Sequence, residues 1–146
     1  PRRLHAIFDA LRSLAAEARL VLPLHPRTRK KLQNMGNIAS LTAGIDVIEP
    51  VGVFDIIRLL RGARLVLTDS GGMQKEAYFH QVPCITPRDE TEWVEAVLAR
   101  WNQLVGAEPG KILNAWRSAR GPKEQAENLY GDGRASEKVI SELVAG

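Results

Sequence analysis

The stretch Leu65–Ala77, with the sequence LVLTDSGGMQKEA, decides how this chain folds. The letters LVLT are typical of a short buried strand, the two glycines indicate a turn, and MQKEA continues as a helix. A strand that runs through a glycine turn into a helix is the unit from which open parallel sheets are built. Such sheets bind ligands beyond the carboxyl ends of their strands, which here means at Ser70, Gly71 and Gly72.

The same alternation of strands and helices continues on both sides of this stretch. We expect strands at 20–24, 45–48, 65–68, 82–86 and 103–105, and helices at 4–15, 27–35, 54–61, 73–80, 91–99, 112–120 and 134–144. Thr91 is the expected N-cap of its helix, and a loop-rich bend is expected at 121–133. The pattern predicts an α/β fold, a Rossmann-like doubly wound parallel sheet with helices on both faces.

Composition and charge narrow the class of protein. A chain of 146 residues fits one domain, since domains hold roughly 100 to 200 residues. With 45% hydrophobic and 25% charged residues, a mainly disordered or fibrous protein is excluded. The formal charge of +3 argues only weakly for nucleic acid. We interpret the basic cluster of Arg27, Arg29, Lys30 and Lys31 as a solvated helix face or as counter-charge beside a phosphate, and we expect no nucleic-acid partner.

The cysteine content and the distribution of apolar residues bear on location. Cys84 is the single cysteine, so an internal disulfide is impossible, and the sequence lacks the Cys/His spacing of a zinc site. No apolar run approaches the ~20 residues that cross a bilayer. The sequence therefore predicts a cytoplasmic protein with no metal and no membrane association.

The glycine turn suggests a site for an anion. Without side chains, Gly71 and Gly72 let a phosphate approach the N–H groups at a helix N-terminus, and Ser70 adds a hydroxyl donor. The spacing matches neither the Walker A loop nor the dinucleotide fingerprint. A tight turn with an N-cap serine is the alternative. Glu76, one turn further on, is either a ligand for two ribose hydroxyls or a solvated helix glutamate.

Several blocks together resemble one family. TDSGGMQKEA (68–77), VPCITPRDETEW (82–93), WNQLVG (101–106) and LYGDGRAS (129–136) are similar to the non-hydrolysing UDP-N-acetylglucosamine 2-epimerases, as are PLHPRT (23–28) and Glu49-Pro50. The resemblance covers residues 1–146 and concerns only the family's C-terminal, UDP-binding domain. It implies one Rossmann-like half of a GT-B enzyme whose N-terminal domain is not in this sequence.

The resemblance also implies a set of substrate-binding residues. Ser70, Gly71 and Gly72 would contact the diphosphate, Glu76 the ribose hydroxyls, and Arg88 would face the diphosphate unless it is a surface arginine. His25 would lie near the UDP-sugar or a second, regulatory UDP-sugar, unless it hydrogen-bonds its own turn. Where the family carries aromatic residues that pack on uracil, this chain has Val53 and Ile56, so the chain departs from the family at the base while it matches it at the phosphates.

The family reaction inverts C2 of UDP-N-acetylglucosamine by elimination and return of UDP, and the resemblance places it in cell-surface polysaccharide biosynthesis. The family's proton-transfer residues lie in the N-terminal domain, so no catalytic residue and no activity are expected of this chain alone. No cofactor is implied. The implied partners are UDP-N-acetylglucosamine or UDP, the N-terminal domain, and a second copy in a homodimer. The alternatives are a stand-alone UDP-sugar-binding or regulatory module, and a GT-B glycosyltransferase domain.

Overall fold

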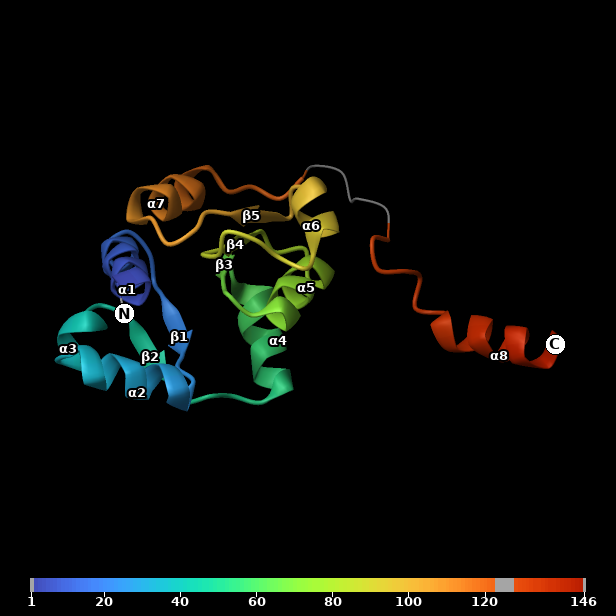
Figure 1. Ribbon diagram of the computed structural model, residues 1–146, viewed down its shortest axis with the longest axis horizontal. Coiled ribbons are helices and arrows are strands. Elements are labelled where there is room, and N and C mark those ends of the chain that lie inside the picture. The colour runs from blue at the N-terminus through green and yellow to red at the C-terminus, as the bar shows by residue number, and fades with distance from the viewer. Residues whose placement is uncertain (1, 123–127, 146) are drawn as a thin grey trace.

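Strands and helices alternate along the chain in the computed structural model, which describes residues 2–122 and 128–145 (Figure 1). The strands are β1 (Val21–Pro23), β2 (Asp46–Ile48), β3 (Val66–Leu67), β4 (Cys84–Thr86) and β5 (Asn102–Leu104). The helices are α1 (Arg2–Ala15), α2 (Pro26–Met35), α3 (Ile38–Leu41), α4 (Val53–Gly62), α5 (Gly71–Phe79), α6 (Val94–Leu98), α7 (Pro109–Ser118) and α8 (Ala135–Ala145). Each predicted strand and helix is found, and α3 is an addition that the sequence analysis did not predict.

The strands are parallel and form two sheets. β1 pairs with β2, with Val21 opposite Asp46, and β3, β4 and β5 form the second sheet in that order. The α/β fold of parallel strands joined by helices is thus confirmed, but the ladder is divided where one continuous sheet was expected. β3 pairs with β4 through only two residues, so it presents a very short edge to any further strand.

One hydrophobic core spans both sheets. Its buried members come from α1 (Phe8, Ala10, Leu11 and Leu14), from the first half of the chain (Leu24, Leu32, Leu41 and Ile45) and from the second half (Ile85, Val105, Ile112 and Ala115). α1 packs against α7, so the first and the seventh helix cover the same core. The core thereby fixes the sheet edge from which the strand-end loops extend.

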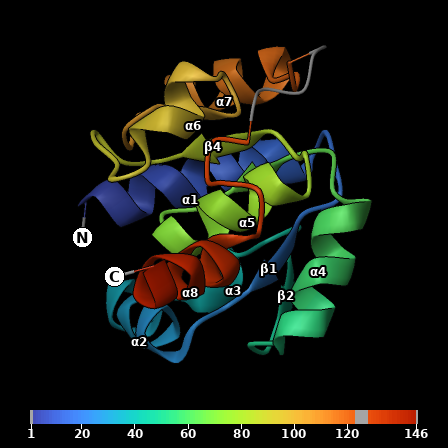
Figure 2. The same cartoon turned by 90° about the vertical axis from the view of Figure 1, so that its right-hand side faces the viewer.

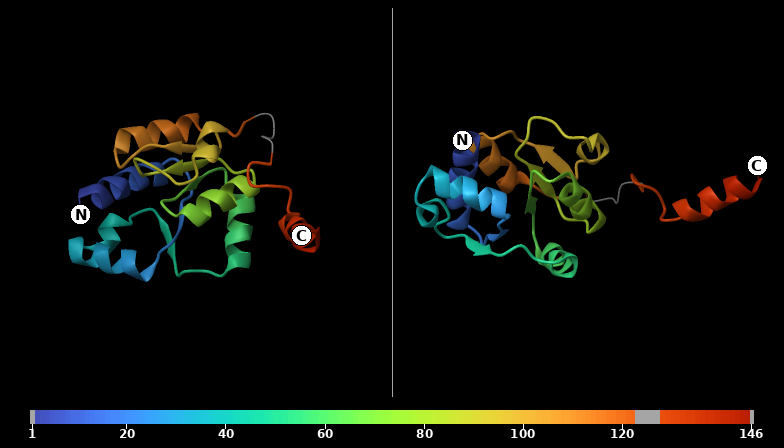
Figure 3. Two further views of the ribbon diagram at one scale, coloured as in Figure 1. Left: turned by 45° about the vertical axis from the view of Figure 1, so that its right-hand side comes forward. Right: turned by 60° about the horizontal axis from the view of Figure 1, so that its bottom comes forward.

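The C-terminal part of the described chain lies apart from this core. Figures 1 and 3 show α8 extending away from the body, and every described residue of α8 is exposed. Its exposed apolar side chains are Val139, Ile140, Leu143 and Val144. The body presents α4, α5 and α6 on the side from which the chain leaves toward α8 (Figure 2). The middle of the predicted bend, 123–127, lies outside the described residues.

Candidate functional site

The turn between β3 and α5 has the geometry of a capped helix start. Ser70 is the N-cap, and its Oγ accepts a 3.4 Å hydrogen bond from the backbone N–H of Met73. The N–H of Ser70 donates to Oγ1 of Thr68 at 3.1 Å, which fixes the chain just before the helix. The N–H groups of Gly71 and Gly72 belong to the first helical turn, which has no intrahelical acceptors for them. The turn therefore presents backbone donors and the positive end of the helix dipole.

The two glycines of this turn differ in their surroundings. A Cβ on Gly72 would find only Oγ of Ser70, at 3.9 Å, and Gly72 is exposed. A Cβ on Gly71 would collide with the carboxylate of Glu92 and would stand 2.8 Å from Nε1 of Trp93. The sequence analysis gave both glycines the same role. The structure shows that Gly71 is needed for close packing of the 87–93 loop, whereas the face of Gly72 is open.

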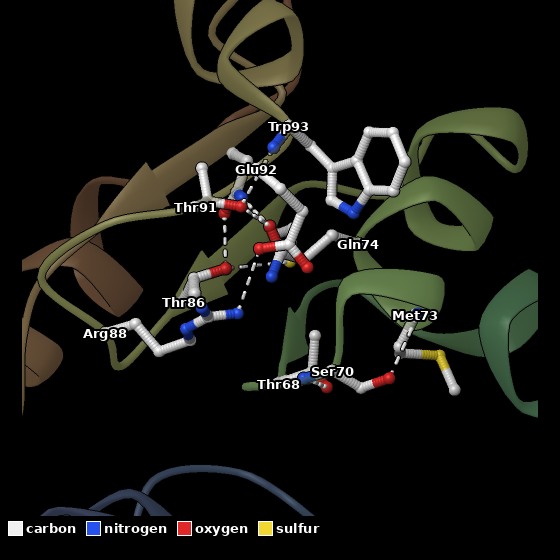
Figure 4. A network of polar contacts seen from close by, with 11 residues as sticks. Thr68, Ser70, Met73, Gln74, Thr86, Arg88, Thr91, Glu92 and Trp93 are labelled. Carbon is white, nitrogen blue, oxygen red and sulfur yellow. Dashed lines mark hydrogen bonds and ion pairs between the residues drawn. The ribbon is translucent and has the colours of Figure 1, made fainter. Parts of the chain in front are cut away.

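Arg88 reaches the turn from a neighbouring strand end. β3 and β4 are parallel neighbours, so the loop after β4 begins at the same sheet edge as the glycine turn. Arg88 is partly buried there, and its Nη1 donates to Oε2 of Glu92 at 3.2 Å (Figure 4). The same Glu92 side chain lies against Gly71. The structure thus brings Arg88 and Gly71 to opposite sides of one carboxylate.

A buried polar network holds this loop on α5 (Figure 4). Oε1 of Gln74 accepts hydrogen bonds from the Thr91 hydroxyl at 2.7 Å and from Nδ2 of Asn102 at 2.9 Å. Oδ1 of Asn102 in turn accepts from the Thr86 hydroxyl at 2.8 Å. Gln74, Thr86 and Asn102 are each buried, so their hydrogen bonds to one another take the place of bonds to water, except at Nε2 of Gln74, for which no partner is found among the described residues. It ties β4, β5 and the loop to the helix of the glycine turn.

The prediction that Thr91 begins a helix is wrong. α6 begins at Val94 with Trp93 as its N-cap, and no side chain caps it. The hydroxyl of Thr91 donates to Gln74 and accepts a 3.2 Å hydrogen bond from the N–H of Trp93. A tertiary contact therefore uses the group that a capping box would have used. The network residues escaped prediction because their partners lie 16 to 28 positions away in the sequence, so no local pattern links them.

An aromatic cluster surrounds Lys75. Its ammonium lies 3.7 Å from the ring centroid of Trp93 and 4.8 Å from that of Tyr130, which is cation–π geometry. Tyr130 stands edge-on to Trp93 at 6.0 Å and to Tyr78 at 5.2 Å, and burial raises the pKa of its phenol. The N–H of Leu129 donates to the hydroxyl of Tyr78 at 3.2 Å. These contacts anchor the segment that leads to α8 on α5.

Two predicted ligands lie in less defined surroundings. Glu76 is half-exposed on the helix face of Gly72, four residues on, with its Oε2 4.0 Å from Nε2 of His80. His25 is exposed and its Nδ1 accepts a 3.2 Å hydrogen bond from the N–H of Arg27, so it caps α2. This is the turn hydrogen bond that the sequence left open as an alternative. Within the described residues, no hydrogen bond or ion pair joins His25 to α5.

The residues expected near a base lie at the start of α4. Val53 is the first residue of that helix, and its side chain and that of Phe54 are 62% and 78% exposed. Ile56 is partly buried. An exposed apolar surface at a sheet edge suits a planar ring, but none of these contacts identifies a base, and uracil packing stays a prediction.

The surroundings of Cys84 disfavour its reactive thiolate form. It lies in the middle strand of the second sheet with 3% of its surface exposed, and burial raises the pKa of its thiol to about 12. In the part of the chain that the structure describes, no group of acidic, histidine and cysteine side chains is arranged to hold a metal ion. None of the described helices is long and apolar enough to cross a membrane.

Comparison with known proteins assigns the chain to a family. Residues 1–144 match the family model described as UDP-N-acetylglucosamine 2-epimerase. The chain is 46% identical over 145 residues to a UDP-2,3-diacetamido-2,3-dideoxy-D-glucuronate 2-epimerase from Pseudomonas aeruginosa, covering 98% of this chain and 40% of that protein. It is 38% identical over 129 residues to a UDP-N-acetylglucosamine 2-epimerase from Methanocaldococcus jannaschii, covering 87% of this chain and 35% of that protein.

Solved structures agree with the fold. The M. jannaschii UDP-GlcNAc 2-epimerase, solved in complex with UDP-GlcNAc and UDP, is similar with a TM-score of 0.86 and 35% identity. That match covers 99% of this chain and 41% of the solved chain. The Neisseria meningitidis enzyme bound to UDP-GlcNAc gives a TM-score of 0.82 at 30% identity, over 100% of this chain and 42% of that one. The chain spans about 40% of the length of the relatives it matches.

Proposed function

Since the chain belongs to the UDP-N-acetylglucosamine 2-epimerase family, we propose that residues 1–146 form the C-terminal, UDP-binding domain of such an enzyme. One observation carries the proposal. The open first turn of α5, with exposed Gly72 and the backbone donors of Gly71 and Gly72, lies at the same sheet edge as Arg88. Backbone N–H groups, a helix dipole and a guanidinium are together suited to a diphosphate.

Each predicted ligand then has a physical role. The N–H groups of Gly71 and Gly72 and the hydroxyl of Ser70 donate to phosphate oxygens, and Arg88 supplies a positive charge. Glu76, one turn along the same face, accepts hydrogen bonds from the ribose hydroxyls. His25 would have to give up its hydrogen bond to Arg27 to contact a UDP-sugar, so we assign it the weakest role.

In the complete enzyme, this domain would stabilise the leaving group. Elimination of UDP from C1 of the sugar leaves a negative charge on the diphosphate, and preorganised donors at the α5 N-terminus lower the cost of that charge. They would also hold UDP until it adds back after protonation at C2. We assign no proton transfer to this chain. The same proposal has four further parts. The catalytic groups lie in another domain, the complete enzyme is a homodimer, it lies in the cytoplasm, and it serves polysaccharide biosynthesis.

A second UDP-sugar should be tested as a substrate beside UDP-N-acetylglucosamine. The P. aeruginosa relative, at 46% identity, acts on a diacetamido glucuronate sugar linked to UDP. Both reactions require the same hold on UDP, so the contacts at α5 serve either. Two alternatives would bind UDP in the same way: a stand-alone UDP-sugar-binding module and a GT-B glycosyltransferase domain. Only an assay of the reaction distinguishes them from an epimerase domain.

The decisive experiment restores the rest of an enzyme. The chain is fused behind the N-terminal domain of the M. jannaschii relative, and the fusion is given each UDP-sugar in D₂O. Epimerisation at C2 incorporates deuterium there, which proton NMR detects, whereas the chain alone should incorporate none. Transfer of the sugar to an acceptor would instead identify a glycosyltransferase. Turnover by the chain alone would refute the assignment of catalysis to another domain.

A further inference from the structure

Glu92 occupies an unusual place for a carboxylate. Its Oε1 lies so close to the α-carbon of Gly71 that a Cβ there would collide with it, and its Oε2 accepts from Nη1 of Arg88 at 3.2 Å. One oxygen thus lies against the first turn of α5 and the other on the guanidinium, the two elements that would hold phosphate. Figure 4 shows the contact between Glu92 and Arg88. The side chain is half-exposed, so a path to solvent is open.

The charge of Glu92 matters for anything that binds here. The positive end of a helix dipole and a guanidinium both attract an anion, and the carboxylate of Glu92 already lies beside the first and pairs with the second. While the pair persists, Arg88 is neutralised, and a diphosphate that approaches Gly71 meets a like charge. Lys75, a second cation on α5, is held against the ring of Trp93, with its Nζ 3.7 Å from the ring centroid.

The backbone around Glu92 is fixed on both sides. The hydroxyl of Thr91 donates to Gln74 at 2.7 Å and accepts from the N–H of Trp93 at 3.2 Å. The ring of Trp93 packs edge-on against Tyr130. A rotation of the Glu92 side chain therefore removes the carboxylate from Gly71 without a change in the backbone of the loop, while the ring of Trp93 stays beside Gly71.

We propose that Glu92 is an internal anion of this site, which pairs with Arg88 and covers Gly71 until the diphosphate of the nucleotide displaces it into solvent. Arg88 then exchanges one anionic partner for another. The inference rests on the proposed function, because it names the group that UDP must displace. It makes Glu92 a residue that weakens the hold on the diphosphate and eases its release.

The test compares three probes of rising charge, uridine, UMP and UDP, by titration calorimetry on the purified chain. Glu92→Gln keeps the size of the side chain and removes its charge, so UDP should bind about fivefold more tightly, the scale of one exposed ion pair. The gain should be smaller for UMP and absent for uridine. Glu90→Gln makes the same charge change at an exposed position of the same loop and should leave all three affinities unchanged.

Each other outcome is informative. Unchanged or weaker UDP binding by Glu92→Gln, or an equal gain for uridine, overturns the inference while the proposed function stands. A chain that does not bind UDP at all overturns the proposed function, and the inference with it. Glu92→Ala is measured beside Glu92→Gln, with thermal unfolding of both. If neither variant folds, Glu92 is a structural residue and the displacement model is wrong.

Discussion

The hydroxyl of Thr91 donates a 2.7 Å hydrogen bond to Oε1 of Gln74, and this bond joins the loop of Arg88 to the helix that begins with the glycine turn. Gln74 is 1% exposed, so the bond is made out of contact with bulk water. Asn102 donates to the same oxygen, and through Thr86 the network reaches β4. The position of the 87–93 loop, which carries Arg88, thus depends on the buried neutral side chains of this network.

Thr91→Val should weaken this attachment. The variant keeps the shape of the side chain but removes the donor, which should lower the free energy of unfolding by about 1–2 kcal/mol in urea titrations. UDP affinity should fall as well, because Arg88 loses its support. Thr91→Ser retains the hydroxyl and serves as the control. Equal behaviour of the two variants would show that the hydrogen bond is unimportant.

The two glycines should respond differently to alanine. In Gly71→Ala the new methyl group would stand 2.8 Å from Nε1 of Trp93 and against Glu92, so a loss of about 1–3 kcal/mol in unfolding free energy is expected. In Gly72→Ala the methyl group meets open space, and the stiffer unfolded chain should make the variant neutral or about 0.4–1 kcal/mol more stable. Denaturant titrations of both variants test this, and similar changes would contradict it.

Cys84 should resist thiol reagents and should make the protein less stable at alkaline pH. Because burial raises the pKa of the folded thiol to about 12, the stability that the protonated thiol contributes is fully present below the pKa of the unfolded thiol. It is lost as pH rises from there through the higher pKa of the folded thiol. A disulfide reagent at neutral pH should label it only upon unfolding. In Cys84→Ala the free energy of unfolding should fall less steeply between about pH 9 and 12 than in the unsubstituted chain. Rapid labelling of the folded chain would contradict the burial.

Asp89 should affect stability in acid. Its carboxylate accepts from Nη1 of Arg3 at 2.6 Å, and this hydrogen bond lowers its pKa below the usual value. The stabilisation is therefore present above the pKa of the unfolded carboxyl and is lost as pH falls through the lower pKa of the folded one. In Asp89→Asn the free energy of unfolding should fall less steeply below about pH 4 than in the unsubstituted chain. Glu90→Gln is the control. Both groups are exposed, so high salt should diminish the difference.

Hydrophobic patterns and turn residues were sufficient to predict most of the fold. Strands such as 82–86 and helices such as 54–61 follow from short apolar runs and from helical spacing, and both are confirmed as β4 and α4. The short α3 was missed because Ile38–Leu41 is a single turn that Asn37 caps, too brief to show periodicity. The start of α6 was misplaced because the hydroxyl of Thr91 bonds a residue 17 positions away.

The candidate site was predictable only where its chemistry lies in one stretch of sequence. Ser70, Gly71 and Gly72 are contiguous, so the capped turn could be foreseen. The position of Glu92 on Gly71 joins loops from two strand ends, and the network of Gln74 and Asn102 joins a helix to a strand 28 residues on. Such contacts depend on tertiary packing, which no local pattern encodes.

The measurement that tests the account most directly is a calorimetric titration of UDP into the purified chain and into Gly72→Asp. We expect saturable binding by the unsubstituted chain and its loss in Gly72→Asp, because a carboxylate on the open face of the turn repels the diphosphate. Thermal unfolding without ligand should be nearly the same for both, since Gly72 is exposed and little packs on it. Absence of binding by the unsubstituted chain, or undiminished binding by Gly72→Asp, would contradict the assignment of the α5 turn as the diphosphate site.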